Sequence, residues 1–130
     1  MENKIIVNRV LLEKQMKIKK NLKKEYDLKM LGLIKQTLLD DKVINLKIID
    51  IRKKLAFADF IILGSGTSNR HIINMAKTVK EKIKENFYFS PPVEGMEHSS
   101  WILIDAGSVV INIFKPEARD FYNLEKIWNN

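Results

Sequence analysis

The sequence lacks cysteine, long apolar runs and histidine clusters, and each absence excludes a class of protein. Without cysteine there is no disulfide framework, no thiolate zinc site and no cysteine nucleophile. No apolar run approaches the length of about 18 to 20 residues that spans a bilayer. The two histidines, His71 and His98, have no second ligand at the spacing of a zinc site. We therefore expect no metal, no cofactor and no membrane partner. The expected location is the cytoplasm, with a mitochondrial or plastid matrix as the alternative.

The positive charge of the chain is concentrated at its N-terminus. The 130 residues carry a formal net charge of +7, and residues 1–26 hold eight Lys and Arg against Glu2, Glu13 and Glu25. Residues 27–130 are nearly neutral, so we divide the chain into a basic extension (1–26), either disordered or helical, and a single domain (27–130). Two interpretations of the extension stay open: an arm that contacts the phosphates of RNA, or a solvated leader without a partner.

The order of predicted elements indicates an α/β (α+β) domain with a mixed β-sheet flanked by helices. Apolar spacing predicts a helix over about 28–39, with a stripe formed by Leu28, Leu31, Ile34, Leu38 and Leu39. Strands are predicted over 46–51 and 57–63, and the second is continuously apolar, which indicates burial on both faces. A helix over 69–86 follows, then a short edge strand near 87–89 or 93, and finally two strands over 101–105 and 109–114.

The last two strands form the most clearly predicted hairpin of the sequence. Strict alternation places five branched apolar residues on one face, which we expect in the core: Ile102, Ile104, Val109, Ile111 and Ile113. The opposite face is an apolar strip with two polar groups set into it: Trp101, Leu103, Asp105, Val110, Asn112 and Phe114. Such a face is either covered by a helix or kept for a partner.

The turn over 64–68, between a predicted strand and a predicted helix, carries two glycines and is where a phosphate would bind. It matches neither the phosphate-loop nor the dinucleotide-binding pattern, so we favour a tight turn with Ser68 or Asn69 as the helix N-cap. This arrangement also occurs in nucleotidyltransferases, whose chemistry needs paired carboxylates to hold magnesium. No Asp-x-Asp or Glu-x-Glu pair follows here, so we expect no enzyme. His71, in the first helical turn, is expected to face solvent or a partner.

Five short motifs occur in the order and spacing of one known family. They are Ala58-Asp59-Phe60; Gly66-Thr67-Ser68 with Arg70; Val93-Glu94-Gly95; Trp101 to Asp105 with Gly107; and Arg119 with Phe121-Tyr122, Leu124-Glu125 and Trp128. In this series the chain resembles the ribosomal silencing factor (Iojap-like) family from about Leu28 to Trp128. The resemblance implies a nucleotidyltransferase-like domain without the catalytic carboxylates, which agrees with the missing acidic pair.

The resemblance also implies a function and a partner. Family members bind ribosomal protein fourteen of the large subunit (uL14) on the surface that faces the small subunit. They thereby block subunit joining and translation by steric exclusion when nutrients are short. Carried over to this sequence, the partner-binding residues are Trp101, Asp105, Gly107, Val110, Phe114, Arg119 and Tyr122. The resemblance implies no catalytic residue, and whether the free protein forms a homodimer is left open.

Two positions depart from the family's pattern. Ser108 stands where the family usually has an acidic residue, and Asn112 stands where a histidine is common. Loss of a carboxylate removes a charge-assisted contact to a basic ribosomal protein, so we expect the departure to change the strength of docking and not its site. The alternatives to a translational repressor are a nucleotidyltransferase-like enzyme and a plain RNA-binding domain.

Overall fold

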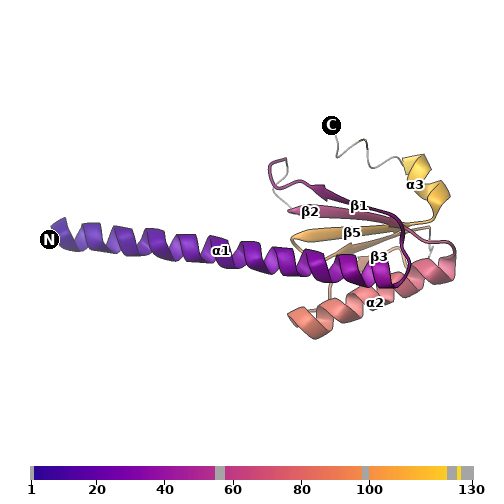
Figure 1. Ribbon diagram of the computed structural model, residues 1–130, viewed down its shortest axis with the longest axis horizontal. Helices are drawn as coiled ribbons and strands as arrows, with labels where there is room; N and C mark the ends of the chain where they lie inside the picture. The colour runs from indigo at the N-terminus through magenta and orange to yellow at the C-terminus, as the bar shows by residue number, and fades with distance from the viewer. Residues whose placement is uncertain (1, 55–57, 98–99, 123–125, 127–130) are drawn as a thin grey trace.

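The structure is a computed structural model, and it describes residues 2–54, 58–97, 100–122 and 126. Within these residues the elements follow in the order α1 (Glu2–Asp40), β1 (Ile44–Asp50), β2 (Phe60–Ser65), α2 (Asn69–Phe87), β3 (Val93–Glu94), β4 (Trp101–Asp105), β5 (Val109–Phe114) and α3 (Pro116–Tyr122). The predicted fold, a mixed sheet flanked by helices, is confirmed (Figure 1).

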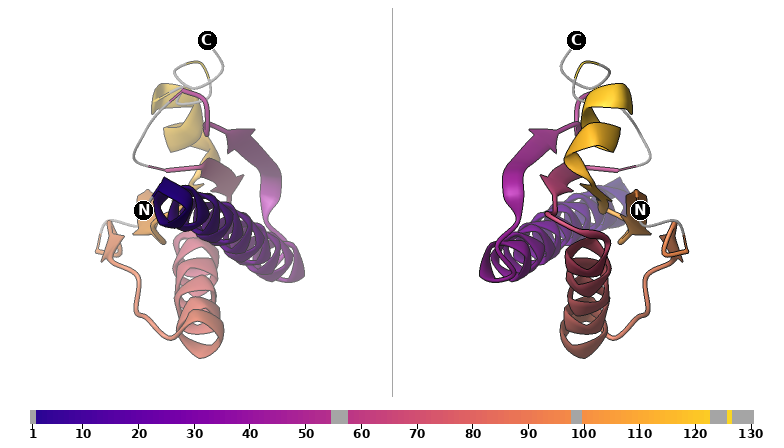
Figure 2. Two further views of the ribbon diagram at one scale, coloured as in Figure 1. Left: turned by 90° about the vertical axis from the view of Figure 1, so that its left-hand side faces the viewer. Right: turned by 90° about the vertical axis from the view of Figure 1, so that its right-hand side faces the viewer.

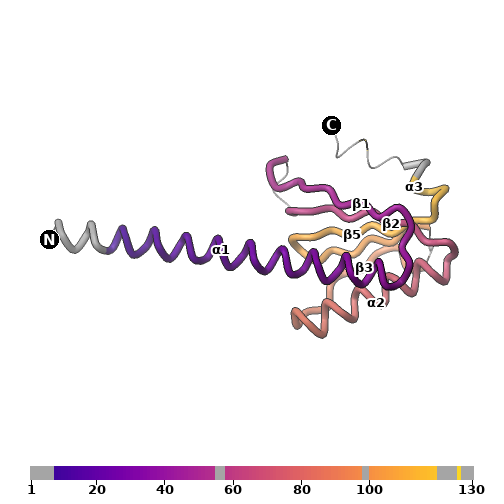
Figure 3. The backbone as a smooth tube through the Cα atoms, in the orientation of Figure 1, coloured from indigo at the N-terminus to yellow at the C-terminus, as the bar shows by residue number. Residues whose placement is uncertain are grey.

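Helix α1 is much longer than the predicted helix over 28–39, because it begins at Glu2 and ends at Asp40. The coloured part of its backbone runs without a break into the domain (Figure 3). The sequence has no proline in this stretch, and lysine, leucine and isoleucine, which are compatible with a helix, fill most of it. The extension is therefore helical in the structure. Its N-terminal half projects beyond the sheet (Figure 1).

The C-terminal half of α1 packs on the sheet through Met30, Ile34 and Leu38, each at most 1% exposed. The predicted stripe is wrong at two positions, since Leu28 is 47% and Leu39 is 46% exposed. At about 100° per residue, both leucines lie more than ~100° around the helix from Ile34. Met30, one turn before Ile34, takes the place on the inner face.

The sheet has the strand order β1-β2-β5-β4-β3, with β2 and β5 parallel and the other neighbours antiparallel. Strand β2 is buried along its whole length, as its continuous apolarity predicted. It begins at Phe60, and Phe57, where the prediction began this strand, lies outside the described residues. Strand β1 begins earlier than predicted, at Ile44, and the edge strand β3 forms at Val93, one of the two predicted places.

Helix α2 confirms the predicted helix over 69–86 and the predicted cap. The Ser68 side chain accepts a hydrogen bond from the backbone N–H of His71 at 3.1 Å, which satisfies one of the free donors of the first turn. The buried residues of the helix are Ile72, Met75, Ala76, Val79 and Ile83. They face the sheet, and α1 and α2 lie side by side beneath it (Figure 2).

His71 is only partly open to solvent, and both of its ring nitrogens bond within the chain, which corrects the prediction. The residue is half-buried, and its Nδ1 accepts a hydrogen bond from the backbone N–H of Thr67 at 3.0 Å. The proton therefore lies on Nε2, which donates to the carbonyl oxygen of Asp41 at 2.6 Å. The ring ties the start of α2 to the residues that follow α1. Spacing along the chain could not indicate this contact, because the two residues are 30 positions apart.

Two apolar clusters lie on the two faces of the sheet. The larger lies between the sheet and the helices α1 and α2, and it includes all five hairpin residues that alternation assigned to the core. The smaller lies on the other face and comprises Ile49, Ile51, Ala58, Ile61, Leu63 and Phe114. Ala118 of α3 packs against it, so α3 covers part of this face (Figure 2).

Candidate functional site

The hairpin of β4 and β5 has the predicted bounds, and its second face forms one continuous surface. The register pairs Trp101 with Phe114, Leu103 with Asn112 and Asp105 with Val110. Paired residues of an antiparallel sheet share a face, so these six side chains lie together, on the side away from α1 and α2. We refer to the six residues as the outer face.

The outer face is buried at one end and exposed at the other. Phe114 is 1% exposed and belongs to the smaller core cluster. Trp101, Leu103 and Val110 are half-buried, and Asp105 is exposed. Among the predicted partner-binding residues, Phe114 therefore supports the face from within, whereas Trp101, Val110 and Asp105 reach its surface.

Trp101 is held in one orientation by two neighbours. Its indole N–H donates to Oδ1 of Asn112 at 3.0 Å, and its ring stacks on Phe114 with centroids 5.3 Å apart and planes 30° apart. Asn112 is only 5% exposed, so this bond satisfies a buried amide. The asparagine, one of the two departures from the family's pattern, thus has a structural role beside the predicted contact residues.

Asp105 combines a turn-forming role with a free negative charge. Its Oδ1 accepts a hydrogen bond from the backbone N–H of Gly107 at 2.9 Å, in a turn where Gly107 has φ +84°. A positive φ favours glycine, and an aspartate side chain commonly closes such a turn. Within the described part of the chain, no ion pair neutralises Asp105. The carboxylate is therefore available to a cation of a partner.

A hollow of about 240 Å³ adjoins Trp101 at the edge of the sheet, lined by Glu94, Gly95, Trp101 and Leu103. Gly95 has φ +92°, and a Cβ atom at this position would lie 2.1 Å from the carbonyl oxygen of Trp101. Glycine is thus required for the close approach of β3 and β4. Glu94 places a second exposed carboxylate beside the apolar strip.

Arg119, also predicted as a contact residue, is engaged within the chain. Its Nη1 donates to the carbonyl oxygen of Asn45 at 2.6 Å and to Oγ of Ser65 at 3.2 Å, and Ser65 is 1% exposed. These bonds hold α3 against the ends of β1 and β2. Tyr122 ends α3, and its side chain lies outside the described part of the structure.

A second polar cluster was not predicted. The Nζ of Lys23 lies 2.8 Å from Oδ2 of Asp27 and 2.9 Å from Oδ2 of Asp59, which joins α1 to the start of β2. These hydrogen bonds raise the pKa of Lys23. Burial is the largest single influence on the Asp59 carboxyl and favours its neutral form. Hydrogen bonds with Lys23 and Asp27 and the positive charges of Lys23 and Arg52 together outweigh burial and lower the pKa of this carboxyl. Only the position of Lys23 within a lysine-rich run was visible in the sequence, and a run does not show which lysine is paired.

The described residues contain no group of three His, Cys, Asp or Glu side chains placed to hold a metal ion. None of the described helices combines the length and the apolarity needed to cross a membrane.

Comparison with known proteins identifies the family. A family model described as "Ribosomal silencing factor during starvation" matches residues 23–130. The chain belongs to the ribosomal silencing factor family. The resemblance found in the sequence motifs is thereby confirmed. The match begins at Lys23, which is also the first of the described α1 side chains to bond to the rest of the domain.

Relatives in this family come from bacteria and from organelles. The chain is 35% identical over 99 residues to the ribosomal silencing factor of Zymomonas mobilis, covering 76% of this chain and 74% of that protein. It is 33% identical over 73 residues to that of Bacillus subtilis, covering 56% of this chain and 62% of that protein. A mouse relative, 34% identical, is named "Mitochondrial assembly of ribosomal large subunit protein 1", and the match covers 62% of this chain and 37% of that protein.

Solved structures confirm the fold of the silencing factor domain. A crystal structure from Chromobacterium violaceum matches with a TM-score of 0.75 and 31% identity, covering 79% of this chain and 86% of that chain. One from Bacillus halodurans matches with a TM-score of 0.70 and 28% identity, covering 78% and 94%.

Proposed function

We propose that this member of the family is a translational repressor. It binds the large ribosomal subunit through ribosomal protein fourteen and sterically keeps the small subunit from joining, in the cytoplasm or in an organelle that contains ribosomes. The family supports an action on ribosomes, and the name of the mouse relative refers to the large subunit. The observation that supports the docking site is the outer face, where half-buried apolar side chains adjoin exposed carboxylates.

The chemistry of the outer face suits a basic protein. Trp101 and Val110 offer apolar area that helices α1 and α2 do not cover, and tryptophan is enriched among residues that dominate binding energy. Asp105 and Glu94 place negative charge at the margin of this apolar area. Complementary charge at a margin steers association and sets orientation, while the apolar centre supplies affinity.

The predicted partner-binding residues take different parts in this proposal. Trp101, Asp105, Gly107 and Val110 contact ribosomal protein fourteen directly. Phe114 supports Trp101 from below, and Arg119 positions α3 beside the face through its bonds to β1 and β2. Tyr122 is kept in the proposed contact, as the family resemblance implies.

We further propose that the protein acts by binding and not by catalysis. The sequence has no Asp-x-Asp or Glu-x-Glu pair after the turn over 64–68, and the described residues offer no metal cluster in its place. Purified protein supplied with nucleotides and magnesium should release no product. Steady turnover that is lost on changing Asp59 or Asp105 would contradict this proposal.

Charge substitutions at Asp105 test the docking site. Asp105→Asn keeps an oxygen for the N–H of Gly107 and removes only the charge, whereas Asp105→Lys reverses it. If the charge contacts a basic partner, affinity for isolated ribosomal protein fourteen should fall in that order, with a loss of about tenfold or more for the lysine variant. Glu81→Lys, an equal charge change on the exposed face of α2, is the matched control and should bind as the parent does. Equal binding by all four folded proteins would place the docking site elsewhere.

The basic extension forms a second proposed contact, with ribosomal RNA. It is helical, and its described residues 8–24 are exposed to solvent. Removing residues 1–22 spares the pairing of Lys23 and should therefore leave the fold intact. Because phosphate contacts weaken with salt, the truncated protein should lose ribosome affinity at low salt more than at high salt. Unchanged binding at both salt concentrations would make the extension a leader without a partner.

A further inference from the structure

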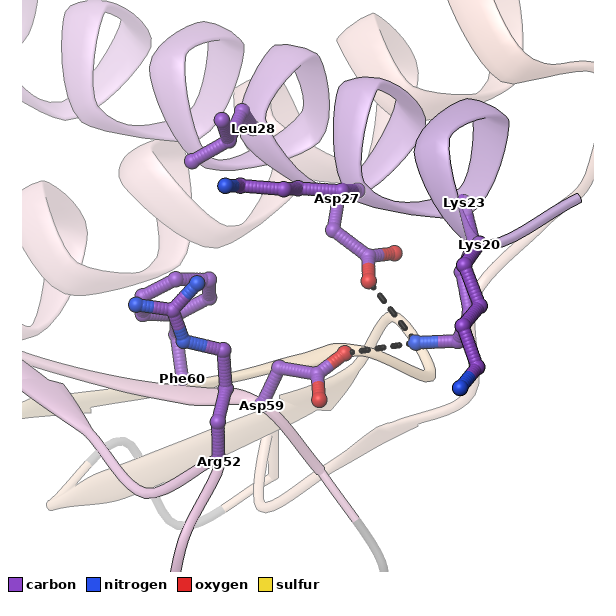
Figure 4. Close-up of a pocket in the computed structure, with 8 residues that line it drawn as sticks. Lys20, Lys23, Asp27, Leu28, Arg52, Asp59 and Phe60 are labelled. Carbon is purple, nitrogen blue, oxygen red and sulfur yellow. Dashed lines mark hydrogen bonds and ion pairs between the residues drawn. The ribbon is translucent and has the colours of Figure 1, made fainter. Parts of the chain in front are cut away.

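A notch lies between α1, at the point where this helix leaves the domain, and the segment that joins β1 to β2 (Figure 4). The notch has a volume of about 240 Å³ and is lined by Lys20, Lys23, Lys24, Asp27, Leu28, Arg52, Asp59 and Phe60. Four of these side chains are cationic and two are carboxylates. We refer to this hollow as the basic notch, and it lies outside the outer face.

The two carboxylates of the basic notch are already paired, which leaves its other cations in excess. Lys23 lies between Asp27 and Asp59 and bonds to both. In Figure 4, Lys20 extends from α1 beside this group, on the same side as Lys23. Neither Lys20 nor Lys24 has a hydrogen bond or an ion pair within the described part of the chain, and both are exposed. An anion that enters the notch therefore meets two cations that have no competing partner.

Arg52 is held in place by two neighbours, and these contacts leave some of its N–H donors without a partner among them. Its guanidinium lies 5.0 Å from the centroid of the Phe60 ring, and Phe60 is 5% exposed. Its Nε and Nη2 bond to the carboxylate of Asp50, whereas Nη1 takes part in none of these bonds. A planar guanidinium fixed on an aromatic ring presents its remaining N–H groups in a defined direction, which suits a phosphate oxygen.

The cations continue beyond the notch as a track along α1. A neighbouring hollow is lined by Val10, Glu13, Lys14, Met16, Lys17 and Lys20, so three of its six lining residues are lysines and the two hollows share Lys20. From Lys14 to Lys24 the lysines recur every three or four residues and share one side of the helix over roughly 15 Å. A track of this length fits several phosphates in series better than one free anion.

The basic notch lies beside the turn that joins the two strands of the outer face. The backbone N–H of Asp59 donates to the carbonyl oxygen of Ser108 at 2.7 Å, and the N–H of Phe60 donates to the same oxygen at 3.0 Å. Ser108 follows Gly107 in the turn between β4 and β5. A ligand in the basic notch would therefore be a neighbour of a protein bound near Asp105.

We propose that the basic notch binds the phosphodiester backbone of an RNA strand and that Lys20, Lys24 and Arg52 contact its phosphates. This inference deepens the proposed function and rests on it, because the large ribosomal subunit is then the source of the RNA. The site itself is separate from the outer face and has its own test.

The test measures the affinity of the full chain for a fluorescently labelled RNA hairpin as a function of salt. Each phosphate contact contributes about 0.7 to 0.9 to the slope of log affinity against log salt. The double variant Lys20→Gln, Lys24→Gln should lower this slope by about 1.4 to 1.8. The double variant Lys77→Gln, Lys80→Gln removes the same charge from the exposed face of α2 and should leave the slope unchanged. Equal losses in both pairs would overturn the proposal, since the effect would then come from net charge alone.

Two further measurements distinguish binding of an RNA strand from binding of free phosphate, and distinguish the basic notch from the outer face. Inorganic phosphate should compete only as strongly as chloride at equal ionic strength; selective displacement of the RNA would show a site for an isolated anion and would overturn the RNA assignment. Asp105→Lys should keep the salt slope of the parent for the isolated hairpin. Suppose that Asp105→Lys binds ribosomal protein fourteen normally while the Lys20, Lys24 variant lowers the salt slope of RNA binding. The proposed docking site on the outer face is then contradicted, whereas the proposed RNA site in the basic notch is supported. An unchanged slope in the Lys20, Lys24 variant overturns the notch alone.

Discussion

Trp101→Phe isolates the contribution of one buried hydrogen bond to the outer face. Phenylalanine keeps an aromatic ring to stack on Phe114 but removes the indole N–H that donates to Oδ1 of Asn112. Asn112 is 5% exposed, so its oxygen would lose its partner where water has little access. Leaving such an acceptor unsatisfied costs about 1 to 3 kcal/mol. Because Trp101 is only half-buried, the loss of packing should be the smaller effect.

Urea unfolding followed by circular dichroism measures this cost. With a slope of about 2 kcal/mol per molar urea, the midpoint should fall by about 0.5 to 1.5 M. Asn112→Leu should lower the free energy of unfolding by less than Trp101→Phe does, because the half-buried indole N–H can then bond to water. The double variant should recover about 1 kcal/mol relative to the sum of the two single changes. If Trp101→Phe unfolds at the urea concentration of the parent, or the two changes are additive, the bond does not hold this face.

Three further substitutions test the backbone at two glycines and the polar link between α1 and the start of β2. Gly95→Ala should destabilise the fold by about 2 kcal/mol or more in thermal unfolding, because φ is +92° and the new Cβ would lie 2.1 Å from the carbonyl oxygen of Trp101. Gly32→Ala, whose Cβ would meet nothing within 4 Å in a helix, should instead stabilise it by about 0.5 to 1 kcal/mol; a loss there would contradict the helical site. Against the opposing effect of burial, the bonds of Asp59 with Lys23 and Asp27 and the charges of Lys23 and Arg52 together hold its folded-state pKa below its ordinary 3.8. This carboxylate therefore stabilises the fold above about pH 4, and that stabilisation is lost as the pH falls through the lowered value. Asp59→Asn should therefore flatten the acid limb of the unfolding free energy against pH, and an unchanged limb would show that the pair contributes nothing.

Features that depend on local periodicity could be predicted from the sequence. Two strands of alternating residues around Gly107 determine the faces of the hairpin, since a shift by one residue would expose Ile104 and its neighbours. Ser68 at the start of an amphipathic run likewise determines where α2 begins. Alternation alone is therefore sufficient to place Trp101 and Asp105 on one face of the hairpin.

Features that depend on distant neighbours could not be predicted in the same way. The burial of Phe114 depends on Ile61 and Leu63, because β2 is the parallel neighbour of β5 and nothing local specifies that pairing. The inner face of α1 is ambiguous in sequence, since apolar residues occur around the whole helix. Long-range polar contacts such as that between Lys23 and Asp59 have no periodic signal at all.

Subunit joining gives the most direct test of the central claim. Purified large subunits are incubated with the parent protein, with Asp105→Lys or with the control Glu81→Lys, and small subunits are then added while light scattering reports their association. The parent and Glu81→Lys should suppress the rise in scattering in proportion to the large subunits they occupy, and folded Asp105→Lys should allow joining. If the parent leaves joining unchanged although it is bound to large subunits, or if Asp105→Lys suppresses it as fully as the parent, steric exclusion through the outer face is contradicted.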